Sequence, residues 1–445
     1  MHQPYARKLT LVLLAVGAAL AGAGWVAARP TGAADPPPAV PEPFAADVEG
    51  RTADIAFFAR RADEDPQSAE DRAQLAALYL QRGRETGDEA DVRRAEATAR
   101  RSLALRTSHN GKTFVTLASA LLAQHRFREA REVAEELVGG DPDVESYRAL
   151  LGETQLELGD YDAARATFAS LDPLVAPLSV APRLARWAEL SGRPDAARRI
   201  LANALADARR RPELPAEQVA WFHYRLGDLE LRAGRLAAAE RTFAAGLAIE
   251  PNDHRLLGAM ARLEALRGRP QAAVEYGERA IAVVLDPATL GVVGDAYAAL
   301  GDRTRAREYF RAMEVAVGGQ AGPYHRAWSL FLLDHGERVP EVLANAQAEL
   351  ATRRDVYGYD LFAWALHGAG RDAEAREAMT QALRLGTHDA LLFYHAGMIE
   401  RTLGNRPAAR RYLERALAIN SFFHPVQPAT ARATLDSLRR EAAAP

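Results

Sequence analysis

Histidines and acidic residues near the C-terminus are the side chains of this sequence best suited to hold a metal ion. His325, Asp360, His367 and His395 fall in three successive stretches of helix-forming sequence. Imidazole and carboxylate ligands together suit zinc or nickel. However, no two histidines in this part of the chain are four residues apart, the spacing that places two ligands on one face of a helix. A metal-handling accessory protein is the alternative function. We predict instead that these histidines are partly exposed and bind no metal.

One string of residues resembles a nucleotide-binding fingerprint by spacing alone. Gly368 to Ala373 reads Gly-Ala-Gly-Arg-Asp-Ala, but no strand-forming segment precedes it, as the phosphate-binding mechanism requires. The sequence contains no phosphate loop ending in Lys-Ser/Thr, no His-Glu-x-x-His pair and no Gly-x-Ser-x-Gly elbow. We therefore predict that the protein is not an enzyme, has no catalytic residues and needs no cofactor.

The composition favours helices and argues against a nucleic-acid partner. Ala, Leu, Arg and Glu dominate the 445 residues, and these are strong helix formers. The net charge is −3, from 56 basic and 59 acidic residues, so the chain lacks the basic excess of a nucleic-acid binder. Cysteine is absent, which excludes disulfides, thiolate metal sites and a lipoprotein anchor. We expect an all-α protein.

The N-terminus has the pattern of an export signal. Arg7 and Lys8 precede an uncharged apolar stretch, Leu9–Ala28, which is just long enough to cross a bilayer as a helix. Small residues within it offer cleavage sites, so residues 1–28 are either a signal peptide or a signal anchor. The proline-rich residues 29–49 then predict a linker. The rest of the chain is expected outside the cytoplasm, in the periplasm or another extracytoplasmic compartment, and tied to the membrane only if the leader stays uncleaved.

A glycine recurs at a nearly constant interval through the remaining chain. The series is Gly159, Gly192, Gly234, Gly268, Gly301, Gly336, Gly370 and Gly404. From Gly234 onward the intervals are 33 to 35 residues, and His125 occupies the place one period before Gly159. Such a period indicates an array of stacked helical hairpins. Each glycine is expected to end a first helix in a left-handed turn, and prolines at 194, 270 and 407 to open second helices.

Other positions of the unit repeat with the glycine. A small residue comes before it in most units, as at Gly227, Gly294 and Gly397, and an alanine comes five residues after it. A large apolar residue follows the alanine, as at Phe243 and Phe310. With these residues the chain resembles the tetratricopeptide repeat family.

That resemblance implies a right-handed α-solenoid of antiparallel helix hairpins, over residues 50–425. About ten helix pairs are predicted, and residues 426–445 are read as a capping helix and tail. We expect each repeat to contact only its neighbours. The unit at 322–353 departs most from the pattern, because Glu341 stands where alanine is expected.

The resemblance also implies that the first helix of each pair lines a concave groove that binds a protein or peptide. A stripe offset from the packing positions, at intervals of three and four residues, should face this groove. It predicts these partner-binding residues: Tyr357, Asp360, Trp364, His367, Tyr394, His395, Met398, Arg401, Arg255 and Arg262. The stripes further upstream, such as Ala149, Glu153 and Leu156, are plainer, and Trp221 is interpreted mainly as packing. The leading hypothesis is a non-catalytic scaffold whose groove is aromatic, Arg-rich and His-rich in its C-terminal half.

Overall fold

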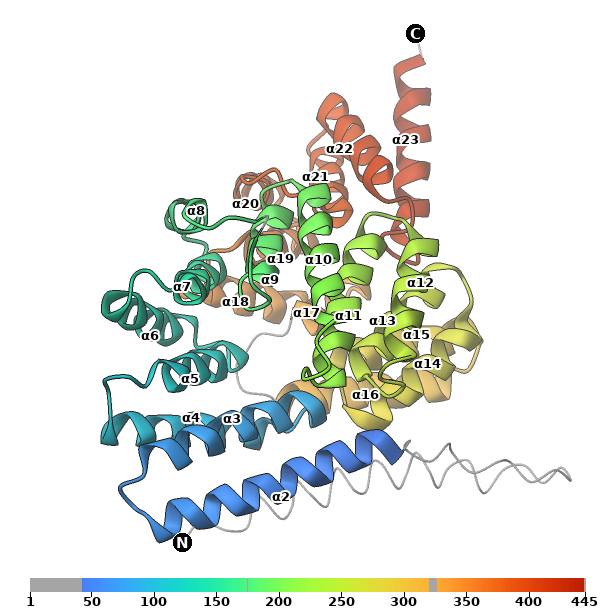
Figure 1. Cartoon of the computed structure of the whole chain (residues 1–445). Helices are drawn as coiled ribbons and strands as arrows, with labels where there is room; N and C mark the ends of the chain where they lie inside the picture. Colours follow the sequence, from blue (N-terminus) through green and yellow to red (C-terminus); the bar gives the residue numbers. More distant parts are fainter. Residues whose placement is uncertain (1–41, 174, 320–325, 444–445) are drawn as a thin grey trace, which may run out of the picture. The chain divides into compact units, whose positions relative to one another are not determined.

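A computed structural model describes residues 42–173, 175–319 and 326–443, and all regular structure among them is helical. Contacts divide the chain into residues 1–42 and residues 43–445, and the helical array belongs to the second unit. The ten hairpins follow one another from the blue to the red end of Figure 1. They are α3 (Ala69–Thr86) with α4 (Glu89–Leu105), α5 (Gly111–Ala123) with α6 (Phe127–Gly140), α7 (Glu145–Leu158) with α8 (Tyr161–Ala169), α9 (Ala181–Leu190) with α10 (Pro194–Ala208), α11 (Ala216–Arg232) with α12 (Leu236–Leu247), α13 (His254–Leu266) with α14 (Pro270–Val283), α15 (Pro287–Ala299) with α16 (Arg303–Gly319), α17 (Arg326–Asp334) with α18 (Val339–Glu349), α19 (Val356–Gly368) with α20 (Asp372–Ala382), and α21 (Ala390–Thr402) with α22 (Arg406–Ile419). The predicted fold class, an all-α solenoid of the tetratricopeptide type, is confirmed.

Two further helices flank the hairpins. Helix α2 (Glu42–Glu64) precedes them, and α23 (Gln427–Ala443) follows them. Helix α23 packs against the last hairpin, where Ala431 and Leu435 join Tyr394 and Leu413 in one apolar cluster. The predicted leader falls outside the described residues, as does most of the proline-rich segment.

The periodic glycines adopt the left-handed conformation that the sequence predicted. Their φ angles run from 68° to 84° between Gly159 and Gly404, a region that costs a residue with a side chain about 1–2 kcal/mol. His125, the weaker member of the series, also has a positive φ, at 57°. The second helices α10 and α14 begin at proline, as expected, because the first amide of a helix has no partner to lose.

Small residues before the turn let the two helices of a hairpin approach closely. A Cβ placed on Gly227 would lie 2.3 Å from the ring of Phe243, and one on Gly294 would lie 2.3 Å from the ring of Phe310. The glycine and aromatic positions of the repeat are therefore one contact, which also joins Gly152 to Phe168, whereas Gly397 contacts Leu413 instead. In the divergent unit, Val342 takes the buried place in α18, one position beyond Glu341.

The expectation that each repeat contacts only its neighbours is wrong. The hydroxyl of Tyr161 in α8 accepts a hydrogen bond of 2.8 Å from the backbone N–H of Val356, 195 residues further along. The Thr387 hydroxyl donates to the Leu190 carbonyl at 2.6 Å across 197 residues. The Asn420 amide donates to the Leu231 carbonyl at 3.0 Å across 189 residues. The array thus returns to itself after a nearly constant length of chain, and teal α7 and α8 lie beside orange α19 and α20 in Figure 1.

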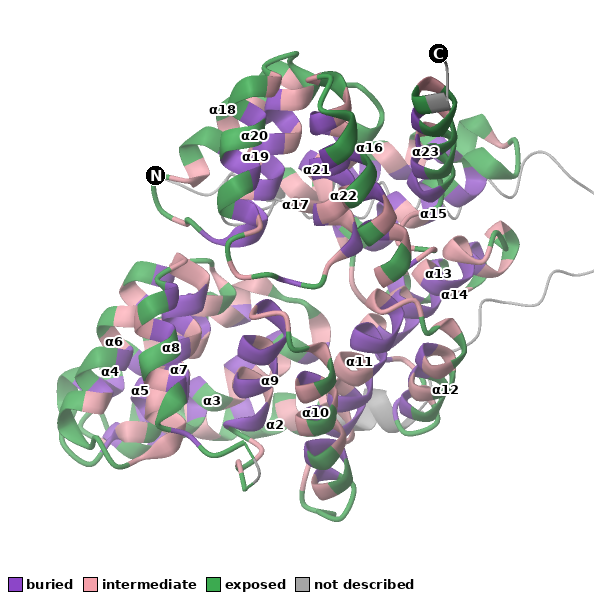
Figure 2. Ribbon diagram, turned by 90° about the horizontal axis from the view of Figure 1, so that it is seen from above, coloured by how far each residue is buried: buried purple, intermediate pink, exposed green. Residues whose placement is uncertain are grey.

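Apolar packing accompanies these hydrogen bonds. One cluster of buried residues contains Tyr161, Phe168 and Trp187 from the earlier hairpins and Val356 and Leu366 from the later ones. Figure 2 shows buried residues concentrated on α9, α11, α19 and α21, whereas exposed residues prevail on α4, α6 and α18. The first helices therefore form the interior of the array, which is where a binding surface has to be sought.

Candidate partner-binding groove

A hollow on the inner side runs along the first helices α7, α9 and α11. One cavity of about 710 Å³ is lined by Trp221, Phe222 and Glu217 of α11, Arg255 of α13, Arg84 of α3 and apolar residues before and at the start of α9. A second, of about 440 Å³, is lined by residues of α7, α9 and α11. Leu178, Ser179, Pro182 and Trp221 line both cavities, so the two adjoin, and together they are called the groove.

Helical spacing explains which side chains line this groove. In α11 the lining residues Trp221, Arg225 and Arg232 are separated by intervals of four and seven, which keep them on one face. In α9 the corresponding residues are Pro182, Arg183 and Arg186. Trp221 is half-buried, packs against the apolar cluster of α9, α10 and α11, and lines both cavities, so its interpretation mainly as a packing residue stays a prediction.

Buried charges form a network beneath the groove. The carboxylate of Asp228, only 2% exposed, pairs with Arg232 at 2.9 Å, with Arg225 at 3.7 Å and with Arg262. Burial alone would raise the pKa of Asp228, but these three guanidinium groups outweigh it and hold that pKa well below its usual value. The carboxyl of Asp228 therefore stays ionised and keeps three arginine side chains in place along the inner face.

The network reaches the later hairpins through Arg232. Its guanidinium also pairs with Glu189 of α9 at 3.6 Å and with Asp389 at 3.7 Å, and it donates to the Tyr357 hydroxyl at 3.3 Å. Burial, and after it the charge of Asp389, raises the pKa of Tyr357 to about 12. Tyr357, which is part of the predicted stripe, is thus a neutral buried link between two parts of the array.

The remaining stripe residues of α19 and α21 contact each other. Asp360 and His395 are fully buried, and their Oδ1 and Nδ1 atoms are 2.7 Å apart. Arg326 of α17 donates to the other carboxylate oxygen of Asp360 at 2.7 Å. Burial alone would raise the pKa of Asp360, but His395 and then Arg326 hold it below its usual value. Three successive first helices are joined by this one carboxylate.

Aromatic stacking and the last helix enclose the rest of the C-terminal stripe. The Trp364 ring stacks on His395 at 4.1 Å and on His367 at 4.9 Å, and Tyr394 is only 4% exposed. Met398 packs into the cluster that α23 completes, and Arg401 pairs with Glu441 of α23 at 2.5 Å. A partner-binding role for these residues stays a prediction, and the structure gives each of them a contact within the protein.

The two predicted arginines of α13 lie closer to open space. Arg255 lines the larger groove cavity and pairs with Glu217 at 2.7 Å. Arg255 also lines a smaller hollow of about 160 Å³, together with Arg262, Gly258 and Ala288. Partner binding by Arg255 and Arg262 stays a prediction.

The candidate metal residues are not gathered into a site among the described residues. The His367 Nδ1 atom lies 2.5 Å from an oxygen of Asp372 at the start of the next helix, and His395 lies on Asp360. Within the described residues, no group of three or more histidine, aspartate or glutamate side chains could hold an ion. His325 lies outside those residues. Gly368 and Gly370, the nucleotide-like string, end α19 and form its hairpin turn.

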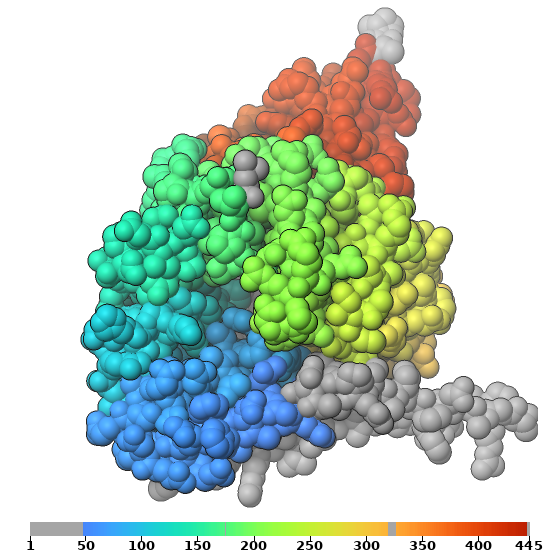
Figure 3. Space-filling view, viewed as in Figure 1, coloured from blue at the N-terminus to red at the C-terminus, as the bar shows by residue number. Residues whose placement is uncertain are grey.

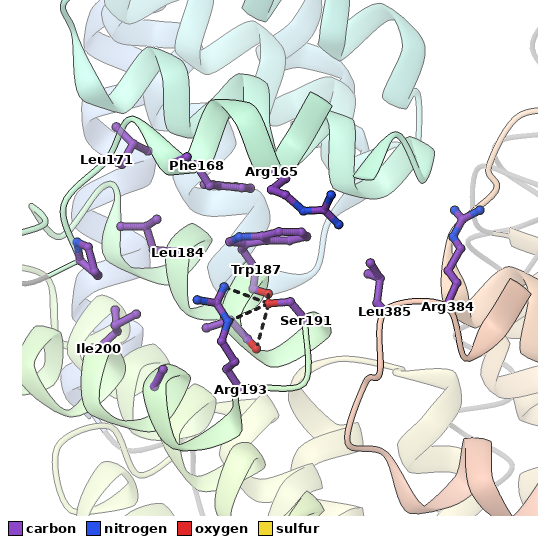
Figure 4. Close-up of a pocket in the computed structure, with 14 residues that line it drawn as sticks. Arg165, Phe168, Leu171, Leu184, Trp187, Ser191, Arg193, Ile200, Arg384 and Leu385 are labelled. Carbon is purple, nitrogen blue, oxygen red and sulfur yellow. Dashed lines mark hydrogen bonds between the residues drawn. The ribbon is translucent and has the colours of Figure 1, made fainter. Parts of the chain in front are cut away.

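A separate hollow of about 590 Å³ lies among α8, α9, α10 and the loop that follows α20 (Figure 4). Its wall is the stacked pair Phe168 and Trp187, with ring centroids 6.0 Å apart. Arg193 donates two hydrogen bonds to the Ser191 hydroxyl, at 3.0 and 3.2 Å, and Leu385 comes from the later hairpins. It shares no lining residue with the groove.

Comparison with known proteins agrees with the repeat architecture. Residues 115–176 and 188–263 each match a family model of the tetratricopeptide repeat, so the chain carries such repeats. Among solved structures it is similar to "Crystal structure of APC/C hetero-tetramer Cut9-Hcn1", with 12% identity over 88% of this chain and 94% of that chain and a TM-score of 0.34. It is also similar to a tetratricopeptide repeat protein from Parabacteroides merdae, with 17% identity over 59% of this chain and 98% of that chain and a TM-score of 0.34. The curated proteins contain no match.

The groove lies partly outside the predicted stripe. Glu157, Arg183 and Arg186 of α7 and α9 line it and are not among the predicted partner-binding residues, whereas Glu153 and Leu156 belong to the plainer upstream stripe. Arg255 and Arg262, which the offset rule names, line hollows on the inner side. What the repeat pattern lacks is a signal that α23 covers α21 and that the α8–α9 loop opens the groove.

Proposed function

We propose that the protein is a non-catalytic scaffold that binds a segment of a partner polypeptide in the groove along α7, α9, α11 and α13. The observation that carries this proposal is the pair of adjoining cavities, which share the half-buried Trp221 in their lining. Trp and Arg are the residue types enriched at the energetic centres of protein interfaces. Ligand-binding cavities usually have volumes of 300–1,000 Å³, a range that includes both groove cavities.

The test compares one groove variant with one outer variant. The Trp221→Ala variant should lose about 2 kcal/mol of partner binding, or roughly thirtyfold in affinity, because an aromatic anchor is removed. Arg199→Ala on the exposed side of α10 is the matched control and should bind as the wild type does. Partners captured from envelope extract are quantified by mass spectrometry for all three proteins. Equal capture by Trp221→Ala and the wild type would contradict the groove assignment.

We also propose that the scaffold acts outside the cytoplasm. Arg7, Lys8 and the apolar stretch Leu9–Ala28 support this, and they lie before the described residues. Within the described part of the chain, no helix has both the length and the hydrophobicity to cross a bilayer. A reporter that is active only outside the cytoplasm, fused after residue 45, should be active. The mass of the mature N-terminus then distinguishes a cleaved signal peptide from an anchor.

A further inference from the structure

Arg84 is a cation without a carboxylate in the larger groove cavity. It belongs to α3, whereas the rest of the cavity comes from residues 177–182, 211–222 and 255, so the cavity exists only because the array returns to itself. The Nε2 atom of Gln81 donates to Glu217 at 3.2 Å across 136 residues and holds α3 against α11 at this point. In Figure 3, blue and green parts of the chain lie next to each other at the surface.

The other charges of the cavity are already paired. Arg255 binds Glu217 at 2.7 Å and also Asp253, which caps α13. Arg211 pairs with Asp207 at 2.8 Å. No carboxylate of the described residues lies within ion-pair distance of the Arg84 guanidinium. Three arginines and one glutamate line the cavity, and Arg84 is the cation left over.

The surroundings of Arg84 agree with an uncompensated positive charge. Arg84 is exposed to solvent, yet desolvation by the protein atoms around it lowers the pKa of its guanidinium; although Glu217 opposes this effect, Arg183 and Arg255 lower the pKa further. A carboxylate entering the cavity would relieve this repulsion and would gain the fork geometry that arginine offers to carboxylates. The walls beside Arg84 are apolar and include Trp221, Leu178 and Leu214.

Building on the proposed scaffold function, we propose that this cavity recognises an acidic side chain of the partner segment, next to a large apolar residue. The carboxylate pairs with Arg84, and the apolar residue packs against Trp221. Because a second cavity adjoins this one and the partner segment occupies both, the acid is an internal Asp or Glu and not a terminal carboxylate. Arg84 determines specificity, whereas Trp221 supplies affinity.

A random dodecapeptide library displayed on phage tests this on the whole chain without knowledge of the partner. Peptides selected by the wild type should be enriched in an acidic residue beside a large apolar one. Selected peptides, synthesised with amidated C-termini, should bind Arg84→Gln about tenfold more weakly, because a charge-assisted hydrogen bond is lost. Arg84→Lys should bind better than Arg84→Gln. Arg93→Gln, which removes an exposed positive charge from α4 away from the cavity, should change binding less than twofold.

Each outcome bears on the proposal. If the wild type and Arg84→Gln select the same acidic residues, or if replacing the peptide acid by its amide has no effect, the proposal is overturned. Binding that depends on a free terminal carboxylate also overturns it. Peptides that are lost in Trp221→Ala but show no acidic preference would overturn only the role of Arg84. Selected peptides that still bind Trp221→Ala at full strength would overturn the groove function itself.

Discussion

The hairpin turns in the two halves of the array have the same backbone conformation and different neighbours. A Cβ on Gly159 would lie 2.2 Å from the Arg354 carbonyl oxygen, and one on Gly192 would lie 2.4 Å from that of Gly386. The later turn glycines, Gly268, Gly301 and Gly370, meet no described atom within 4 Å. Yet φ is 78° at Gly159 and 74° at Gly370. The turn glycine thus has two roles. In every hairpin it allows the positive φ of the turn, and only in the earlier half does it also leave room for the backbone of a distant hairpin.

The largest difference is expected between Gly159→Ala and Gly370→Ala. Both substitutions force a side chain into the left-handed region and should cost about 1 kcal/mol on that account. Gly159→Ala should cost about 3 kcal/mol or more, because the Arg354 loop has to move and the hydrogen bonds around it weaken. Urea unfolding followed by circular dichroism measures both. Equal costs for the two variants would mean that the loop gives way freely and that the contact has no energetic role.

Tyr161→Phe should have the next largest effect. It removes the hydroxyl that accepts the buried N–H of Val356 and leaves that amide without its partner, at a cost of about 1–3 kcal/mol. Tyr276→Phe in α14, a half-buried tyrosine of the later half, is the control and should stay within about 0.5 kcal/mol of the wild type. If both variants unfold at the same urea concentration as the wild type, water replaces the lost hydroxyl.

Thr387→Val should cost about 1 kcal/mol, because it keeps the shape of the side chain and removes one hydrogen bond to the Leu190 carbonyl. Hydrogen exchange locates the effect. The amides of the Gly192 turn should exchange faster, whereas those of the Gly370 turn should not change. Faster exchange throughout the chain would instead indicate that the array opens as a single unit.

The smallest effect concerns pH at a free turn. His335, just before Gly336, is held by Asp295 at 3.4 Å, and this contact raises the pKa of His335 to about 8. Because the folded pKa lies above the unfolded value of about 6.5, its stabilising effect is complete below about pH 6.5 and is lost as the pH rises through about 8. The side chain is 34% exposed, so the effect should stay below about 1 kcal/mol. His335→Asn should remove this part of the pH dependence in urea unfolding measured from pH 6 to 9.

The fold was largely predictable because its determinants are local and repeat. The turn at Gly370, the proline opening α14 and the contact of Gly227 with Phe243 each depend on residues within one hairpin. The bond between Tyr161 and Val356 depends on a small rotation between repeats, added over 195 residues. The sequence of a single repeat does not reveal this accumulated rotation, so the contact between distant hairpins could not be predicted.

For the candidate site, the sequence indicated which side of a first helix faces inward but not which of its residues other elements cover. The offset rule placed Arg255 and Arg262 on the inner side, where they lie beside open space. It could not show that Tyr394 is covered by α23, because the contact depends on where the chain turns after Ile419. Nor could it show Arg84 in the groove, since α3 reaches α11 only through the closed path of the array.

The nearly constant separation of the paired turns restricts how this gene can change in length. An open solenoid can gain or lose a repeat anywhere, because each unit contacts only the next one. Here, a duplication between α8 and α19 would shift Tyr161 and Thr387 by a whole hairpin from their present partners, Val356 and Leu190. A gain or loss of repeats is therefore tolerated best near the ends of the array, and the repeat number between paired turns should be fixed among descendants of this gene.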